Sequence, residues 1–99
     1  MSYFVLCTFD LKNASRQDYD SAYADLEKIG LKKVIVSDQG GKVVIPTTTV
    51  AGTFTGSSAG TVRDSVCEKT KKAFATRQLV SEIFILVGGN WAWSGATTG

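Results

Sequence analysis

The sequence contains no histidine, and its only cysteines are Cys7 and Cys67. Zinc sites are built mainly from closely spaced cysteine and histidine, and no C-x-x-C pair occurs here, so we expect no zinc site. The lack of histidine also excludes Ser-His-Asp catalysis and histidine-based acid–base chemistry. Cys7 lies in an apolar strand pattern and Cys67 in a helical one, which favours free buried thiols over a disulfide or a nucleophile.

A strong charge imbalance and long apolar runs are also lacking. The net charge is +2, which is too small to identify a nucleic-acid binder, although a local basic edge can lie on a nearly neutral body. No apolar stretch approaches the roughly 20 residues of a membrane span. The first apolar run has no basic flank and is interrupted by Asp10, so we expect no signal peptide, no membrane association and a cytoplasmic location.

The 99 residues suit one domain, residues 1–99, and 43% of them are hydrophobic, as is ordinary for a globular protein. The spacing of apolar residues predicts four strands and two helices. The expected strands are 3–9, 31–38, 47–55 and 79–87, and the expected helices lie within 13–30 and 56–78. Residues 39–46 are expected to form a loop or edge irregularity, because Pro46 cannot donate a ladder hydrogen bond.

Both helices carry recognisable end signals. Ser15 and Asp18 have capping-box spacing, Asn13 is an alternative cap, and Gly30 is placed to end the first helix in a left-handed conformation. Ser57 or Ser58 is the expected cap of the second helix. The apolar stripe of the first helix consists of Tyr19, Ala22, Tyr23, Leu26 and Ile29, and that of the second consists of Val62, Val66, Lys69 or Thr70, Ala73 and Phe74.

The order βαββαβ predicts an α+β fold of the ferredoxin-like type, a four-stranded antiparallel sheet with two helices on one face. Period-two alternation in the first strand directs one set of residues away from the helices: Phe4, Leu6, Thr8 and Asp10. A monomer would leave Phe4, Leu6 and Thr8 exposed. Because large exposed apolar patches usually mark interfaces, we expect a homodimer that buries this face.

Asp10 is the candidate site residue, because it ends the first strand at the rim of this face. If two copies met near it, paired carboxylates would suit Mg²⁺ or Mn²⁺, which could activate water for phosphodiester hydrolysis. Position and periodicity alone favour the alternative, a solvated aspartate that hydrogen-bonds its own loop.

Basic side chains occur in three places. Lys12 and Arg16 lie beside Asp10 and could position phosphates of RNA or DNA, and Lys32 with Lys33 is a second candidate pair. A solvated surface is the favoured interpretation of these cations. The basic residues near the end of the second helix are attributed to the helix dipole. The loop GTFTGSSAGT lacks the lysine of a P-loop, which favours a simple helix cap over a phosphate site.

Trp91 and Trp93 share one side of an extended C-terminal tail, residues 90–99. Such a pair could stack on bases. Packing of the tail on the sheet edge or on a partner subunit is the favoured interpretation, since paired aromatics often lie at interfaces.

Several segments resemble one protein family. YFVLCTFDL and DLEKIGLKKV resemble the start of the small CRISPR-associated endoribonucleases, the second Cas protein, and of their VapD-like relatives. TTTVAGTFTGSSAGTVRDSV and IFILVGGNWAWSG resemble the SinR-like branch of that superfamily. The resemblance spans nearly the whole chain through short motifs.

The resemblance implies a ferredoxin-like homodimer joined through its sheets, with tails that cross to the neighbour. It implies that Asp10 binds Mg²⁺ or Mn²⁺ and is catalytic in a metal-dependent endoribonuclease acting on single-stranded RNA or another nucleic acid. No second acid matches the family's surroundings. The superfamily also includes non-cleaving members, which leaves the alternative of a dimeric interaction module that binds a toxin or other defence-system protein in a toxin–antitoxin or CRISPR-like system.

Overall fold

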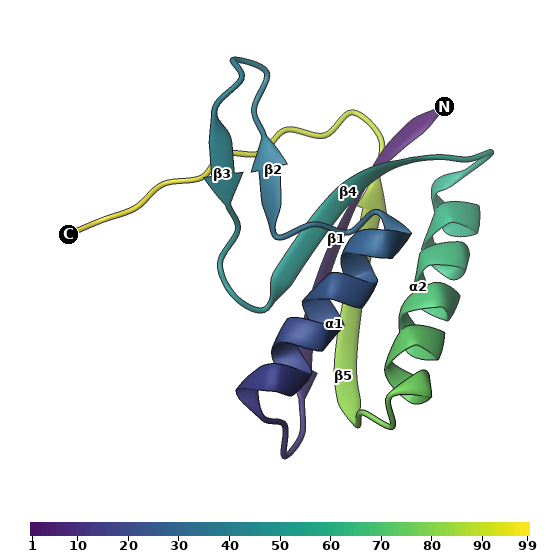
Figure 1. Ribbon diagram of the computed structural model, residues 1–99. Helices are drawn as coiled ribbons and strands as arrows, with labels where there is room; N and C mark the ends of the chain where they lie inside the picture. Colours follow the sequence, from purple (N-terminus) through teal and green to yellow (C-terminus); the bar gives the residue numbers. More distant parts are fainter.

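The computed structural model describes residues 1–99 as two helices packed on one face of a sheet (Figure 1). The elements in chain order are β1 (Ser2–Leu11), α1 (Arg16–Ile29), β2 (Val34–Val36), β3 (Lys42–Val44), β4 (Thr49–Thr55), α2 (Ala59–Thr76) and β5 (Ser81–Gly88). The molecule measures 40 × 37 × 18 Å, so in its thinnest direction it has room for only two layers. Neither helix is long and apolar enough to cross a membrane.

The main sheet is three-stranded and antiparallel, in the order β4-β1-β5. The expectation of a four-stranded sheet is therefore wrong, although the connectivity remains compatible with a ferredoxin-like fold. The place of the fourth strand is taken by one bridge, in which Lys32 and Ala51 exchange backbone hydrogen bonds of 2.8 and 2.9 Å.

Beyond Lys32 the chain pairs with itself and not with β4. Strands β2 and β3 form a separate antiparallel hairpin, in which Ile35 lies opposite Val43. The QGGK turn closes the hairpin, with Gly40 at φ +86°. The expected strand 31–38 is thus shortened, and the expected loop 39–46 contains β3. Beyond Lys32 the hairpin turns away from the edge of β4, so the main sheet ends at this bridge.

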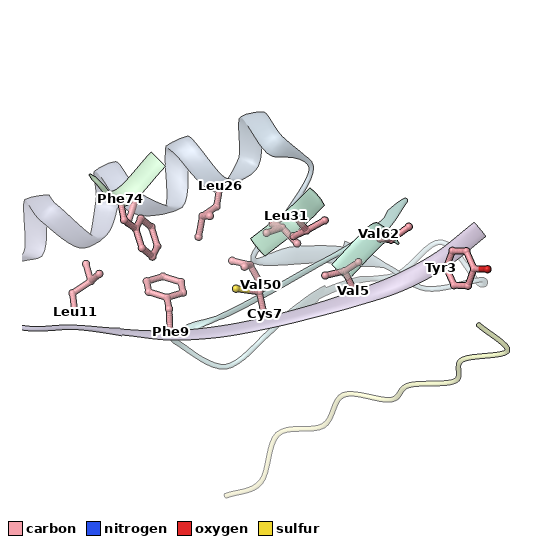
Figure 2. Close-up of a cluster of buried hydrophobic side chains, with 12 residues drawn as sticks. Tyr3, Val5, Cys7, Phe9, Leu11, Leu26, Leu31, Val50, Val62 and Phe74 are labelled. Atoms are coloured by element: carbon pink, nitrogen blue, oxygen red, sulfur yellow. The ribbon is translucent and has the colours of Figure 1, made fainter. Parts of the chain in front are cut away.

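Strand β1 separates the two faces of the sheet by alternation, as predicted. One set of its side chains is buried beneath the helices: Tyr3, Val5, Cys7, Phe9 and Leu11. Figure 2 shows Phe9 and Leu11 on the side of the strand that faces Leu26 and Phe74, with Tyr3 at the far end near Val62, while another segment of the chain passes on the opposite side of the strand. Phe9 lies at the centre of the aromatic part of this core, 5.4 Å from Phe74 between ring centroids.

Helix α1 begins and ends where its sequence signals predicted. The Ser15 side chain accepts a hydrogen bond from the Asp18 backbone N–H, and the Asp18 carboxylate accepts one from the Ser15 N–H, which completes the capping box. Gly30 follows the helix at φ +111°. The turn packs tightly on β4, because a Cβ added to Gly52 would lie 2.1 Å from the Gly30 carbonyl oxygen.

Helix α2 begins at Ser58, whose hydroxyl accepts a hydrogen bond from the Thr61 backbone N–H. Its buried side is formed by Val62, Val66, Thr70 and Phe74. Of the two residues proposed for the middle of this stripe, Thr70 is buried and Lys69 is exposed.

Candidate functional site

Asp10 lies near the end of β1 on the sheet face that points away from the helices. Its side chain is 65% exposed. The hydroxyl of Tyr19, from α1, lies 3.2 Å from Asp10 Oδ1 and donates a hydrogen bond to it. The Leu11 backbone N–H donates to the same hydroxyl at 3.2 Å, so Tyr19 is held between the strand end and the acid. One oxygen of Asp10 is thereby oriented by the helix layer, and the other faces Lys12.

A second acid lies beside it. Glu82, on β5, is directly opposite Asp10 in the antiparallel register. Lys12 joins the two, because its Nζ is 3.7 Å from Asp10 Oδ2 and forms an ion pair with Glu82 Oε1. The hydrogen bond and charge of Glu82, with a smaller contribution from Asp10, hold the pKa of Lys12 above its usual range. Two exposed carboxylates therefore converge on one ammonium group.

The chemistry of these donors fits a hard divalent cation. Mg²⁺ is commonly bound by one or two carboxylates and completes its octahedron with water or phosphate oxygens. A cation in the position of the Lys12 ammonium would lie beside Glu82 but 3.7 Å from Asp10 Oδ2, whereas Mg²⁺ binds oxygen at about 2.0–2.1 Å, so joint binding requires the Asp10 side chain to turn toward it. The chain contains no group of three or more histidine, cysteine, aspartate or glutamate side chains placed to hold an ion, so further ligands would have to come from water, substrate or another chain.

Glu82 was not identified as a site residue from the sequence. It lies within the strongly apolar segment 79–87, where a single carboxylate indicates only that one side of the strand is exposed. Its role depends on the register between β1 and β5, which are separated by almost the whole chain. The sequence signal for it is that Glu82 is the only charged residue in an otherwise apolar strand.

The structure separates the predicted basic residues. Lys12 contacts the acids directly, whereas Arg16 is exposed at the start of α1 and its side chain makes no hydrogen bond or ion pair. Lys32 bridges to Ala51, which lies opposite Leu6 of β1. Leu6 is four residues from Asp10, roughly 13 Å along a strand. Lys33 lies 4.9 Å from the centroid of the Tyr23 ring. The four cations therefore do not form one patch around Asp10.

The outer face of the sheet continues from the acids as an apolar strip. Thr8 lies opposite Phe84, and Leu6 lies opposite Leu86. Phe84 and Leu86 are 63% and 58% exposed, whereas Phe4, Leu6 and Thr8 are half-buried. We define the outer strip as Leu6, Thr8, Phe84 and Leu86. It borders the Asp10–Glu82 pair directly, because Thr8 and Phe84 are the next outward residues on the two strands.

The C-terminal tail covers the other end of this face. The ring of Trp91 stacks on Phe4 of the same chain, with 5.8 Å between centroids. Trp93 lines a groove of about 620 Å³ between the sheet and the β2–β3 hairpin, together with Phe4, Leu6 and Ile35. The two tryptophans thus pack against their own subunit and leave Phe84 and Leu86 of the outer strip exposed.

The cysteines take no part in this site. Cys7 is fully buried, and burial, with a smaller contribution from Cys67, raises the pKa of its thiol to about 11. Both cysteines are free, as predicted, but Cys67 is only half-buried. A reactive thiol needs an accessible thiolate, so Cys7 is unsuited to nucleophilic chemistry.

Comparison with known proteins adds no family assignment. A scan of the chain against protein-family models finds no match. A search of the curated proteins finds none either. The functional argument therefore depends on the geometry of Asp10, Lys12 and Glu82.

Proposed function

We propose that this protein is a divalent-metal-dependent endoribonuclease that hydrolyses phosphodiester bonds of single-stranded RNA at Asp10 and Glu82. The observation that carries the proposal is the convergence of these two exposed carboxylates on Lys12. Like charges directly opposite each other destabilise a sheet, and the Lys12 ammonium between the two acids offsets that repulsion while no metal is bound. Mg²⁺ or Mn²⁺ bound there would polarise the phosphate and activate a water molecule.

The residues of the chain have distinct roles in this proposal. Asp10 and Glu82 are the residues that would hold the cation, which would take over the charge neutralisation that Lys12 now supplies. Tyr19 is a positioning residue, because its hydrogen bond to Oδ1 fixes the orientation of the Asp10 carboxylate. Lys12 neutralises the acid pair without substrate, and with substrate its ammonium turns to a non-bridging phosphate oxygen. The rim is open to solvent, which suits a long flexible substrate.

The first prediction concerns RNA cleavage. Purified protein is incubated with end-labelled single-stranded RNA and Mg²⁺ or Mn²⁺, and the products are resolved by gel electrophoresis. Mutation of a residue that only hydrogen-bonds a metal ligand typically lowers metal affinity or activity about 10–100-fold. Asp10→Ala and Glu82→Gln remove the ligands themselves. Each is therefore expected to lower the cleavage rate at least about 100-fold. Chelation of the metal is expected to abolish cleavage.

Glu27→Gln is the matched control, because Glu27 is an exposed acid of α1 that makes no ion pair. It is expected to cleave at the parent rate. Cleavage by Asp10→Ala at the parent rate would show that the assigned site is wrong. Activity that persists after chelation would contradict the metal-dependent mechanism.

A second candidate function is a non-catalytic dimeric interaction module, part of a toxin–antitoxin or CRISPR-like defence system. The exposed outer strip favours it, because a sheet face this apolar is typical of an interface. RNA that remains intact with every divalent cation, together with copurification of a defined partner that Leu86→Glu abolishes, would favour this function over the nuclease.

A further inference from the structure

The two helices line a shallow, open basic groove on the opposite side of the molecule from the acid pair. Helices α1 and α2 lie side by side on one sheet face (Figure 1). The groove between them has a volume of about 580 Å³. Its charged lining residues are Asp25 and Lys28 from α1, and Lys69, Lys72 and Arg77 from the α2 side. The groove thus presents four cations and one carboxylate.

The single acid is already committed. Arg77 forms a two-pronged ion pair with Asp25, in which Nη2 lies 3.1 Å from Oδ1 and Nε donates to Oδ2. Lys28, Lys69 and Lys72 have no carboxylate within 4.0 Å, whereas Lys71, on the neighbouring side of α2, pairs with Glu68 at 3.9 Å. The whole chain has eleven cations and nine acids, so this groove holds a large part of its unbalanced positive charge.

The helix dipole does not account for Lys69 and Lys72. Favourable dipole interactions are confined to the last turn, and the last turn of α2 contains no basic residue. The explanation drawn from the sequence is therefore wrong for these two lysines. They are three residues apart and lie on one face of the helix, where like charges repel. An anion bound between the helices would remove that repulsion.

We infer that this groove binds the phosphate backbone of double-stranded nucleic acid. The three free lysines are exposed and spread over two helices, which suits a row of phosphates better than a single small anion held by buried donors. No aromatic side chain lines the groove, so it offers no stacking platform for unpaired bases. Contacts limited to phosphates bind a duplex without reading its sequence.

The inference is independent of the proposed nuclease activity, because the groove and the acid pair occupy opposite faces. Binding is measured by fluorescence anisotropy with a labelled DNA duplex in EDTA, which removes any metal-dependent cleavage. Three phosphate contacts predict an affinity that falls about forty-fold between about 50 and 200 mM salt. The double variant Lys69→Gln/Lys72→Gln, which keeps one free lysine, is expected to bind more weakly, with a fall of only about fourfold.

Lys71→Gln is the matched control, since it removes the same charge from the same helix outside the groove, and it is expected to retain nearly the full salt dependence. The inference is overturned if the parent does not bind the duplex, if the double variant binds like the parent, or if Lys71→Gln weakens binding equally. Displacement of the duplex by inorganic phosphate at matched phosphate concentration would also overturn it, in favour of a small-anion site.

Discussion

Thr70 is an unusual residue of the core. Its side chain is fully buried in the apolar stripe of α2, and its hydroxyl has no hydrogen-bond partner. Thr76, one and a half turns later on the same helix, donates to the Lys72 carbonyl oxygen at 2.8 Å. Buried polar groups are usually paired, because an unpaired one loses its hydration without compensation. The unpaired hydroxyl of Thr70 therefore lowers the free energy of unfolding, although the rest of its side chain packs in the core.

Thr70→Val is expected to stabilise the protein by about 1 kcal/mol, because valine keeps the shape of threonine and removes the unpaired hydroxyl. The free energy of unfolding, measured by urea denaturation, checks this. Thr76→Val is the control, since its exposed hydroxyl is paired, and it is expected to leave stability unchanged or slightly lower. A lower stability of Thr70→Val would show that the hydroxyl is paired in solution.

At the scale of elements, one ion pair ties the two helices together. Asp25 and Arg77 are 52 residues apart in the chain, and the Asp25 side chain is only 15% exposed. The hydrogen bond from Arg77 is the main cause that holds the pKa of Asp25 below its ordinary value of 3.8. A carboxyl whose pKa is lowered by folding stabilises the folded state above its unfolded pKa. This contribution is lost as the pH falls through 3.8 toward the lower folded pKa.

A double-mutant cycle with Asp25→Asn and Arg77→Gln is expected to give a coupling free energy of about 0.5–1 kcal/mol at neutral pH. The coupling is expected to disappear in acid. Urea denaturation of the four proteins at about pH 7 and below about pH 3 measures both values. An unchanged coupling in acid would contradict the assignment to the charged carboxylate.

The hairpin β2–β3 is the element that decides the shape of the sheet edge. Its sequence carries a hairpin signal, since the valine-rich segments 34–36 and 42–44 flank Gly40 and Gly41. The same segment was equally compatible with a strand of the main sheet followed by a loop. Whether β2 also extends the main sheet depends on where the hairpin packs, which is decided by contacts distant in the chain.

At the scale of the whole molecule, the C-terminal tail covers only one end of the outer sheet face, and Phe84 and Leu86 remain exposed. The helices lie on the other face, and only 14 of 99 residues are buried. Because the apolar strip is not among them, it adds little to the stability of the protein while the protein is alone. Burial of apolar area against a second copy would stabilise both, at roughly 25 cal/mol per Å². The two acid pairs would then be brought toward each other, because each borders the strip.

Leu86→Glu is expected to convert a homodimer into a monomer, because it places a charge in the centre of the outer strip. Light scattering at high micromolar concentration measures the mass. Val36→Glu is the matched control, because Val36 is 61% exposed on the hairpin and lies outside the strip. It is expected to remain dimeric. A monomeric parent protein under these conditions would exclude the dimer.

The amino-acid sequence by itself determined the local features of this protein. The alternation of β1, the capping box at Ser15 and the left-handed Gly30 depend on neighbours within a few residues, and all three were predictable. The position of Asp10 at an exposed strand end followed from the same alternation.

Only the tertiary structure decided what depends on distant partners. The pairing of β1 with β5 places Glu82 beside Asp10, and the packing of α1 on α2 gathers Lys28, Lys69 and Lys72 around one groove. Neither arrangement leaves a periodic pattern in the chain. The physical reason is that a strand register and a helix contact are chosen by the burial of many side chains at once, whereas a cap or a turn is chosen by one or two.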